Sequence, residues 1–451
     1  MTREHDLARN DNPGGSLDDV ASGRRLAVLV VALALVGAPA IALRAFCAGQ
    51  SCAEAGSAST AVPFCPLPKD LRTEIEAGYR EGRSPDVMAS TRGEGLVEVG
   101  GVPWPQAPYA PSVNAVPIIF FGHGISPGRL PDGVGVDRIA PTIAELIGFD
   151  RSHPEVRSGT ALQNAVVAGA GSPLVVEIVW QGAGGVSFSH LGTPWATSLR
   201  GHEAWTMNGT TGSLPVDPAA VLTTIGTGGV PAQHGITGTL VRDAHGQAVR
   251  AWSTDAPTSI IATLPDDWDH ATRHRARIGL VASDEVDRGL VGGTWYIDHG
   301  HDDLAIGPGD PVSSVARLMA TGYGADDTTD ILGVVLSGAI DRMDRQTGDI
   351  VTAVQQLVPD ATFVITTTGS ANGSLDTNPP DVAASVDRAV GGPVVSATVP
   401  GGLFLDQQVM ATKDITSDDV VRAMDALKSS FGSPLFADAY PGFAVSFSRY
   451  C

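Results

Sequence analysis

The chain has 451 residues, with 29 Lys and Arg against 49 Asp and Glu, and a formal net charge of −20. This acidic balance does not suit nucleic acid or anionic lipid as a partner, and no basic cluster interrupts it. The hydrophobic share of 43%, with 54 Gly and 31 Pro, is typical of a folded, loop-rich globular protein and excludes a disordered one. The length alone favours roughly two to three domain-sized units.

The N-terminal region contains one membrane signal. Residues 26–43 carry no charge and are flanked by arginines on both sides. A segment of this length just spans a bilayer, and the arginines before it favour a cytoplasmic N-terminus. The Ala-Pro-Ala sequence at 38–40 would instead suit signal cleavage, but the leader 1–25 is long for a cleaved signal. We therefore predict a cytoplasmic leader, a single-pass anchor in the cell membrane, and an extracytoplasmic remainder.

All four cysteines follow the apolar segment, at Cys47, Cys52, Cys65 and Cys451. Four cysteines allow three pairings, among which the sequence does not choose. An extracytoplasmic location favours disulfides over free thiols, and we predict that one disulfide ties Cys451 to the juxtamembrane segment. A zinc site is not indicated, because no histidine lies near the first two cysteines.

Residues 44–115 are predicted to form a linker and N-terminal extension. The first part is rich in Ala, Ser, Gly and Pro, as linkers often are. Helical spacing of apolar residues follows at 70–82, and a Pro-rich, extended segment follows at 102–111. We expect the folded domain to begin at residue 116.

From residue 116 onward, short apolar runs alternate with helical patterns. Strands are predicted at 116–121, 174–180, 259–264, 278–282, 294–297, 331–337, 362–367 and 394–399. Helices are predicted at 137–147, 219–225, 311–320, 348–358, 381–390 and 417–429, and the segment 443–447 completes the pattern. The alternation predicts one α/β domain over 116–451, with a mostly parallel sheet and helices on both faces. Ligands bind at the carboxyl ends of such strands, so we expect a site in the loops after Trp180, Ser337 and Thr367.

The stretch 212–238 is predicted to be loop, helix and loop. Asp217 is a good N-cap, Pro218 suits the first helical position, and a glycine-rich run ends the helix 219–225. Because a helix N-terminus offers unpaired N–H groups and partial positive charge, this one suits phosphate or sulfate. The alternative is an ordinary capped helix packed on the sheet.

This stretch also carries a family resemblance. The residues Leu222 to Gly228, followed by Pro231 and by His234-Gly235-Ile236, resemble the nucleophile region of the alkaline phosphatase superfamily. The nearest branch is the nucleotide pyrophosphatase/type I phosphodiesterase branch. Residues 172–182 resemble its first strand, and residues 330–337 and 362–367 resemble the strands before its two later metal motifs. Residues 137–148 resemble its late Ala-Pro-Thr helix.

The order of these segments departs from the family. The Ala-Pro-Thr helix comes late in family members, but here 137–148 precedes the segment 172–182 that resembles the first strand. A circular permutation would explain the order, since the ends of such a domain often lie close together. A chance match of a common strand–helix pattern is the alternative.

The resemblance implies two metal ions, usually zinc, and a Thr or Ser nucleophile. Carried over residue by residue, the first-strand metal ligand becomes Gln181 and the nucleophile becomes Asp217, or its neighbour Pro218 with a one-residue shift. The later metal motifs fall on a stretch containing Asp341 and on Thr368. His123, which follows a predicted strand, would stand in for the family's final histidine.

The ligands that the family needs are thus missing. No histidine follows His301, and glutamine is a poor zinc ligand, so no cofactor is predicted. We expect a catalytically degenerate protein that binds an anionic small molecule or a partner in the cell envelope. The alternative is a hydrolase of phosphate or sulfate esters with a non-standard site, in which Asp217 attacks as a carboxylate.

Two further groups of charged residues have alternative explanations. Residues 298–303 contain His299, His301 and three aspartates, which would suit a surface divalent metal or a solvated acidic loop. Asp341 is followed by Arg342 and Arg345, a spacing that favours a salt-bridged helix surface over a metal site.

Overall fold

The structure, a computed structural model, describes residues 64–91, 98–99, 102–103, 114–184, 195, 198, 201, 203–293, 295–369, 381–429 and 432–451. All of them belong to one unit, Ala61–Cys451. The predicted anchor at 26–43 lies outside these residues. Within the described chain, no helix is both long and apolar enough to cross a bilayer.

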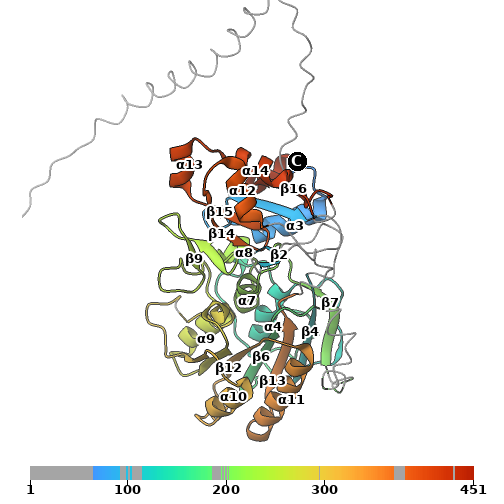
Figure 1. The fold of residues 1–451 in the computed structure, drawn as a ribbon. Helices are drawn as coiled ribbons and strands as arrows, with labels where there is room; N and C mark the ends of the chain where they lie inside the picture. The colour runs from blue at the N-terminus through green and yellow to red at the C-terminus, as the bar shows by residue number, and fades with distance from the viewer. Residues whose placement is uncertain are drawn as a thin grey trace, which may run out of the picture. The chain divides into compact units, whose positions relative to one another are not determined.

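An eight-stranded sheet forms the centre of the fold (Figure 1). Its strands are β4 (Ala115–Gly122), β5 (Gly128–Arg129), β6 (Leu174–Trp180), β7 (Glu203–Thr210), β10 (Ile278–Ala282), β11 (Asp303–Ile306), β12 (Asp330–Leu336) and β13 (Thr362–Thr367). The order is β11-β10-β12-β6-β13-β4-β7-β5, and neighbours from β11 to β13 are parallel. Strand β4 is antiparallel to both β13 and β7. The predicted mixed α/β class with a mostly parallel sheet is confirmed.

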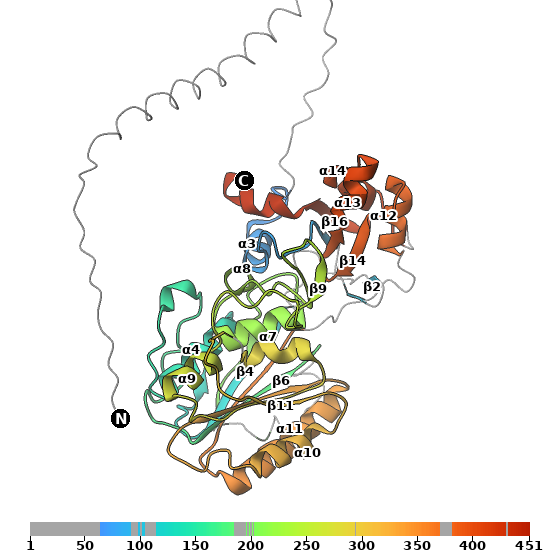
Figure 2. The ribbon, with the colours of Figure 1, turned by 90° about the vertical axis from the view of Figure 1, so that its left-hand side faces the viewer.

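Both faces of the sheet are buried, as the continuous apolar runs predict. Along β6, Val175 and Val179 join one hydrophobic cluster, while Val176 and Ile178 join another. The first face carries α4 (Ile139–Leu146), α7 (Pro218–Thr227), α9 (Leu264–Thr272) and the 3₁₀ helix η3 (Glu285–Leu290), and the second carries α10 (Pro311–Met319) and α11 (Ile340–Leu357). Figure 2 shows α7 and α9 on one side of the sheet and α10 and α11 on the other.

A second, antiparallel sheet has the order β14-β15-β1-β16. Its strands are β1 (Val87–Thr91), β14 (Val395–Val399), β15 (Gly402–Leu405) and β16 (Phe436–Pro441), and its helices are α12 (Val382–Val390), α13 (Gln407–Lys413) and α14 (Ser417–Asp425). The predicted extension 44–115 is therefore not separate from the folded domain. Strand β1 lies inside this sheet, because Val87 and Ala89 are buried in the same cluster as side chains of the C-terminal helices.

The two ends of the described chain meet. Helix α3 (Lys69–Gly78) contacts the C-terminal 3₁₀ helix η4 (Gly442–Tyr450), and a disulfide joins Cys65 to Cys451. The predicted disulfide between Cys451 and a cysteine of the N-terminal region is thus present, as Cys65–Cys451, whereas Cys47 and Cys52 lie outside the described residues. The remaining short elements are β2 (Glu98–Val99), β3 (Val102–Pro103), η1 (Val136–Arg138), η2 (Pro154–Val156), α8 (Pro231–His234), β8 (Leu240–Arg242) and β9 (Ala248–Arg250).

Two strand predictions were wrong. The stretch 259–264 leads into α9, because the Thr263 hydroxyl and the Asp266 carboxylate form a capping box that starts the helix. In 294–297, the described residues form a loop in which the Tyr296 hydroxyl donates to Asp267.

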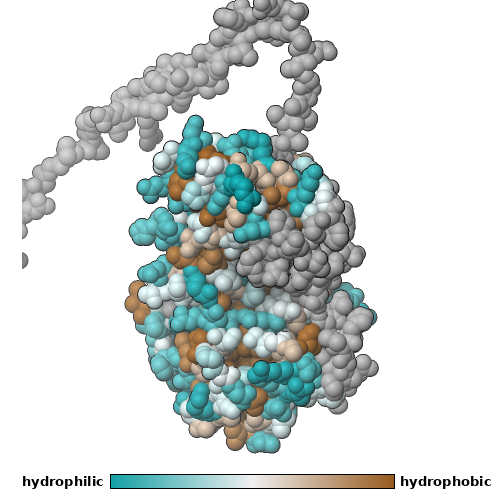
Figure 3. Space-filling model, viewed as in Figure 1, coloured by the Kyte–Doolittle hydropathy of each residue, from teal (hydrophilic) through white to brown (hydrophobic). Residues whose placement is uncertain are grey.

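Figure 3 shows hydrophilic and hydrophobic residues interspersed over the coloured part of one face, in keeping with the chain's many carboxylates.

Candidate functional site

Asp217 begins α7 as the sequence predicts. Its Oδ1 accepts a hydrogen bond from the Ala219 N–H at 3.0 Å and another from the Thr239 hydroxyl at 2.9 Å. The side chain is 2% exposed, and burial raises its pKa above the usual range, opposed by these hydrogen bonds. The carboxylate is thus occupied in capping the start of a helix, which is the ordinary role of an N-cap aspartate.

Two of the residues carried over from the family do come together, at the carboxyl ends of β6 and β13. The Gly182 N–H donates to the Thr368 hydroxyl at 3.1 Å, and the Thr368 N–H donates to the Trp180 carbonyl at 3.0 Å. Gln181 lies between Trp180 and Gly182, and its backbone N–H donates to Leu336 at the end of β12. This edge of the sheet is where the parallel topology predicts a site.

Asp287, on η3, joins this group although the sequence did not single it out. Its Oδ1 accepts from the Gln181 side-chain amide at 2.5 Å, whereas its Oδ2 has no hydrogen bond among the described residues. Burial, and then the nearby Asp284 carboxylate, raise its pKa to about 7. The preceding residue, Val286, belongs to the same hydrophobic cluster as Ala219, which places Asp287 near the start of α7. Only the folded structure reveals this burial.

No hydrogen bond or ion pair joins the other two predicted residues to this group in the described part of the chain. Because β4 is antiparallel to β13, the carboxyl end of β4 lies at the opposite edge of the sheet, where Gly122 pairs with Thr362. His123 therefore cannot stand in for a ligand beside Gln181. Asp341 lies exposed on α11 and forms an ion pair with Arg345 at 2.9 Å, as the salt-bridge interpretation predicts.

The predicted histidine cluster lies on an exposed loop. His301 has a side chain that is 92% exposed, and its nearest ion-pair distance, 3.9 Å, is to Asp303. The His299 ring nitrogen lies 3.0 Å from the carbonyl of Gly300. No group of three or more His, Cys, Asp or Glu that could hold a metal occurs in the part of the chain that the structure describes.

The donors at the family positions do not fit a pair of zinc ions. Zinc sites use thiolate, imidazole and carboxylate ligands. Here the first-strand position is the Gln181 amide, and a hydroxyl, that of Thr368, stands at another position. The Asp217 carboxylate is occupied as a helix cap.

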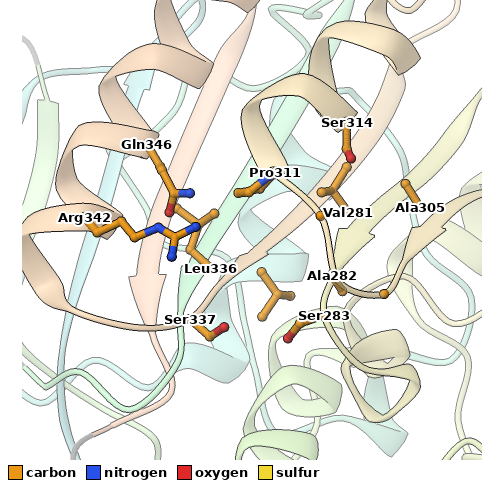
Figure 4. A pocket seen from close by; sticks show the side chains of 13 residues that line it. Val281, Ala282, Ser283, Ala305, Pro311, Ser314, Leu336, Ser337, Arg342 and Gln346 are labelled. Atoms are coloured by element: carbon orange, nitrogen blue, oxygen red, sulfur yellow. The ribbon is translucent and has the colours of Figure 1, made fainter.

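A small cavity opens at the carboxyl ends of β10, β11 and β12, between these strands and helices α10 and α11 (Figure 4). Its volume is about 130 Å³. The lining residues are Val281, Ala282, Ser283, Ala305, Gly307, Gly309, Pro311, Ser314, Val335, Leu336, Ser337, Arg342 and Gln346. Its position after Ser337 agrees with the loop that the sequence indicated, but the serines and the two α11 side chains were not predicted as a set.

Comparison with protein-family models, with curated proteins and with solved structures finds no match to this chain. The resemblance to alkaline phosphatases therefore stays a prediction from the sequence. A function has to be inferred from the chemistry of the two groups at the carboxyl edge of the sheet: the Gln181, Asp287 and Thr368 group and the cavity beside α11.

Proposed function

We propose that this chain is a membrane-anchored, extracytoplasmic binding protein with an alkaline phosphatase-like, circularly permuted domain that does not hydrolyse phosphate esters. The observation that carries the proposal is the burial and hydrogen bonding of the Asp217 carboxylate. The residue at the expected nucleophile position is a buried carboxylate that already accepts hydrogen bonds from Ala219 and Thr239. A nucleophile needs a free lone pair facing the substrate and a cationic clamp for the phosphoryl charge.

The packing of the permuted segment supports the family part of the proposal. Helix α4, which carries the Ala-Pro-Thr sequence, contacts α7, although about 80 residues separate them along the chain. The ends of the described unit meet at the Cys65–Cys451 disulfide, as the ends of a permuted domain would.

One titratable group at the sheet edge favours an alternative, a hydrolase with a non-standard site. Asp287 has a pKa of about 7 and lies beside Gln181. A carboxyl that titrates near neutrality is suited to general acid–base catalysis. In that alternative, Asp287 would hold or accept the proton and Asp217 would remain a cap.

The experiment is a turnover assay on the purified full chain with bis-nitrophenyl phosphate and nitrophenyl sulfate, together with a zinc measurement. We expect no turnover above background and no bound zinc. Turnover that EDTA abolishes would contradict the proposal. Turnover that is lost in Asp287→Asn but kept in Glu285→Gln would establish the alternative, because Glu285 is an exposed carboxyl on the same element.

A further inference from the structure

The cavity beside α11 has an unusual charge for this protein. The chain carries 49 acidic residues and a net charge of −20, yet none of the residues that line the cavity is acidic. Its one charged group is the guanidinium of Arg342. Three hydroxyls, those of Ser283, Ser314 and Ser337, come from separate elements and face the same space. The polar part of the lining therefore offers hydroxyl and amide groups and one positive charge.

Gln346 provides an independent sign of a ligand. Its side chain is 8% exposed, and no other described residue forms a hydrogen bond with its amide. Figure 4 shows this amide directed toward the space between α11, α10 and the strand ends. The amide therefore faces the cavity and not a protein partner, which leaves its donor and acceptor atoms available to a water or a ligand.

Arg342 is placed to act with Gln346. The two residues are one turn apart on α11, so their side chains share one face of the helix. Among the described residues, the Arg342 guanidinium has no ion pair or hydrogen bond, whereas the neighbouring Arg345 is paired with Asp341 at 2.9 Å. Arg342 contributes to lowering the pKa of Asp310, after the hydrogen bonds that the Asp310 carboxylate accepts from Ser313 as the cap of α10.

The start of α11 adds to the positive character of the site. The helix runs for 18 residues from Ile340, and its N-cap is Ala339, whose methyl group cannot accept a hydrogen bond. The first turn of a helix carries partial positive charge and favours an anion. Asp341 lies in the same turn but is paired with Arg345 at 2.9 Å, so the charge of the helix end and that of the Arg342 guanidinium act on the same region.

We propose that this cavity binds a small oxyanion, a phosphate, sulfate or carboxylate group, held by the Arg342 guanidinium, the Gln346 amide and the serine hydroxyls. The volume of about 130 Å³ suits one such group and is below the roughly 300 Å³ at which pockets for larger ligands begin. The site lies on the α10 and α11 face of the sheet, away from Asp217 on the α7 face. Anion binding at this site goes beyond the proposed function, because the anion would bind whether or not the protein hydrolyses a substrate.

The test is calorimetric titration of the purified full chain with inorganic phosphate, sulfate, acetate and glycerol phosphate, each separately. These four probes distinguish which oxyanion the site prefers. Arg342→Gln should weaken the preferred anion roughly 10-fold or more, as expected for a lost charge-assisted hydrogen bond. Arg345→Gln removes the same charge three residues away and should leave the affinity within about 2-fold.

A second variant separates binding from folding. Gln346→Leu should abolish most of the binding while the ligand-free chain still unfolds cooperatively on heating, because leucine keeps the buried stem of the side chain but lacks the amide. No binding of any of the four anions would overturn the proposal. Equal weakening by Arg342→Gln and Arg345→Gln, or unchanged binding in Gln346→Leu, would overturn it too. Because the hydrolysis assay uses other residues, either proposal can fail while the other stands.

Discussion

Glu177 is a carboxyl buried in the middle of the central sheet, and its replacement tests how burial sets a pKa in this fold. It lies on β6 between Gly333 of β12 and Val364 of β13, and it is 2% exposed. Its Oε2 has no hydrogen bond among the described residues, and burial alone raises its pKa to about 8. The folded chain therefore carries Glu177 protonated at neutral pH.

The sign of the effect follows from proton counting. Below the unfolded pKa of 4.5, both states hold the proton, and the carboxyl contributes no pH dependence. Between 4.5 and about 8, the unfolded chain releases the proton while the folded chain keeps it, so the stability falls as the pH rises. At about 1.4 kcal/mol per pH unit, the loss between pH 5 and pH 7 is about 2.5 kcal/mol.

Replacement by glutamine should remove this slope. We expect the stability of Glu177→Gln relative to the unaltered chain to rise by about 2.5 kcal/mol between pH 5 and pH 7. Urea unfolding at several pH values measures it, and Glu285→Gln, an exposed glutamate, is the matched control. The measured quantity is the difference in unfolding free energy between the variant and the unaltered chain. Asp287, Asp302 and Asp438 also have raised pKa values, but they titrate in both chains, so their contributions cancel. Parallel pH profiles for the variant and the unaltered chain would refute the reasoning.

Three further changes have expected outcomes. Arg151→Met should cost about 1.5–3 kcal/mol in urea unfolding, because it removes a buried ion pair with Asp267 at 2.8 Å while Asp267 keeps Arg157 at 3.1 Å; a loss below about 0.5 kcal/mol would contradict this. Replacing Cys65 and Cys451 together by serine should destabilise the fold by about 2–5 kcal/mol and speed proteolysis near the C-terminus, and unchanged cleavage would count against it. Asp217→Ala should lose about 1–2 kcal/mol in thermal unfolding, and Asp217→Asn less, whereas equal losses would show that the cap is not the cause.

The sequence was informative where burial is continuous. The run at β6 is apolar over nearly its whole length because both faces of that strand are covered, and its predicted bounds agree with Leu174–Trp180. Strand β7, Glu203–Thr210, alternates polar and apolar residues near one edge of the sheet and was not predicted. The antiparallel sheet was missed because its strand β1 comes from the N-terminal part of the chain and its partners come from the C-terminal part.

The candidate site was predictable only in its location. Parallel topology places ligands at the carboxyl edge, and Gln181 and Thr368 do lie together there. The raised pKa of Asp287 depends on burial, which no local pattern encodes. The direction of β4 could not be inferred from its composition, and this direction decides that His123 lies at the far edge.

The Cys65–Cys451 disulfide makes the described unit a covalent ring. Because Cys65 is bonded to Cys451, a force that pulls on the chain before Cys65 acts on both the first and the last described segments. The C-terminal helix η4 cannot peel away by itself, and α3 cannot be pulled out alone. A single cut in a surface loop would leave one connected molecule with new ends.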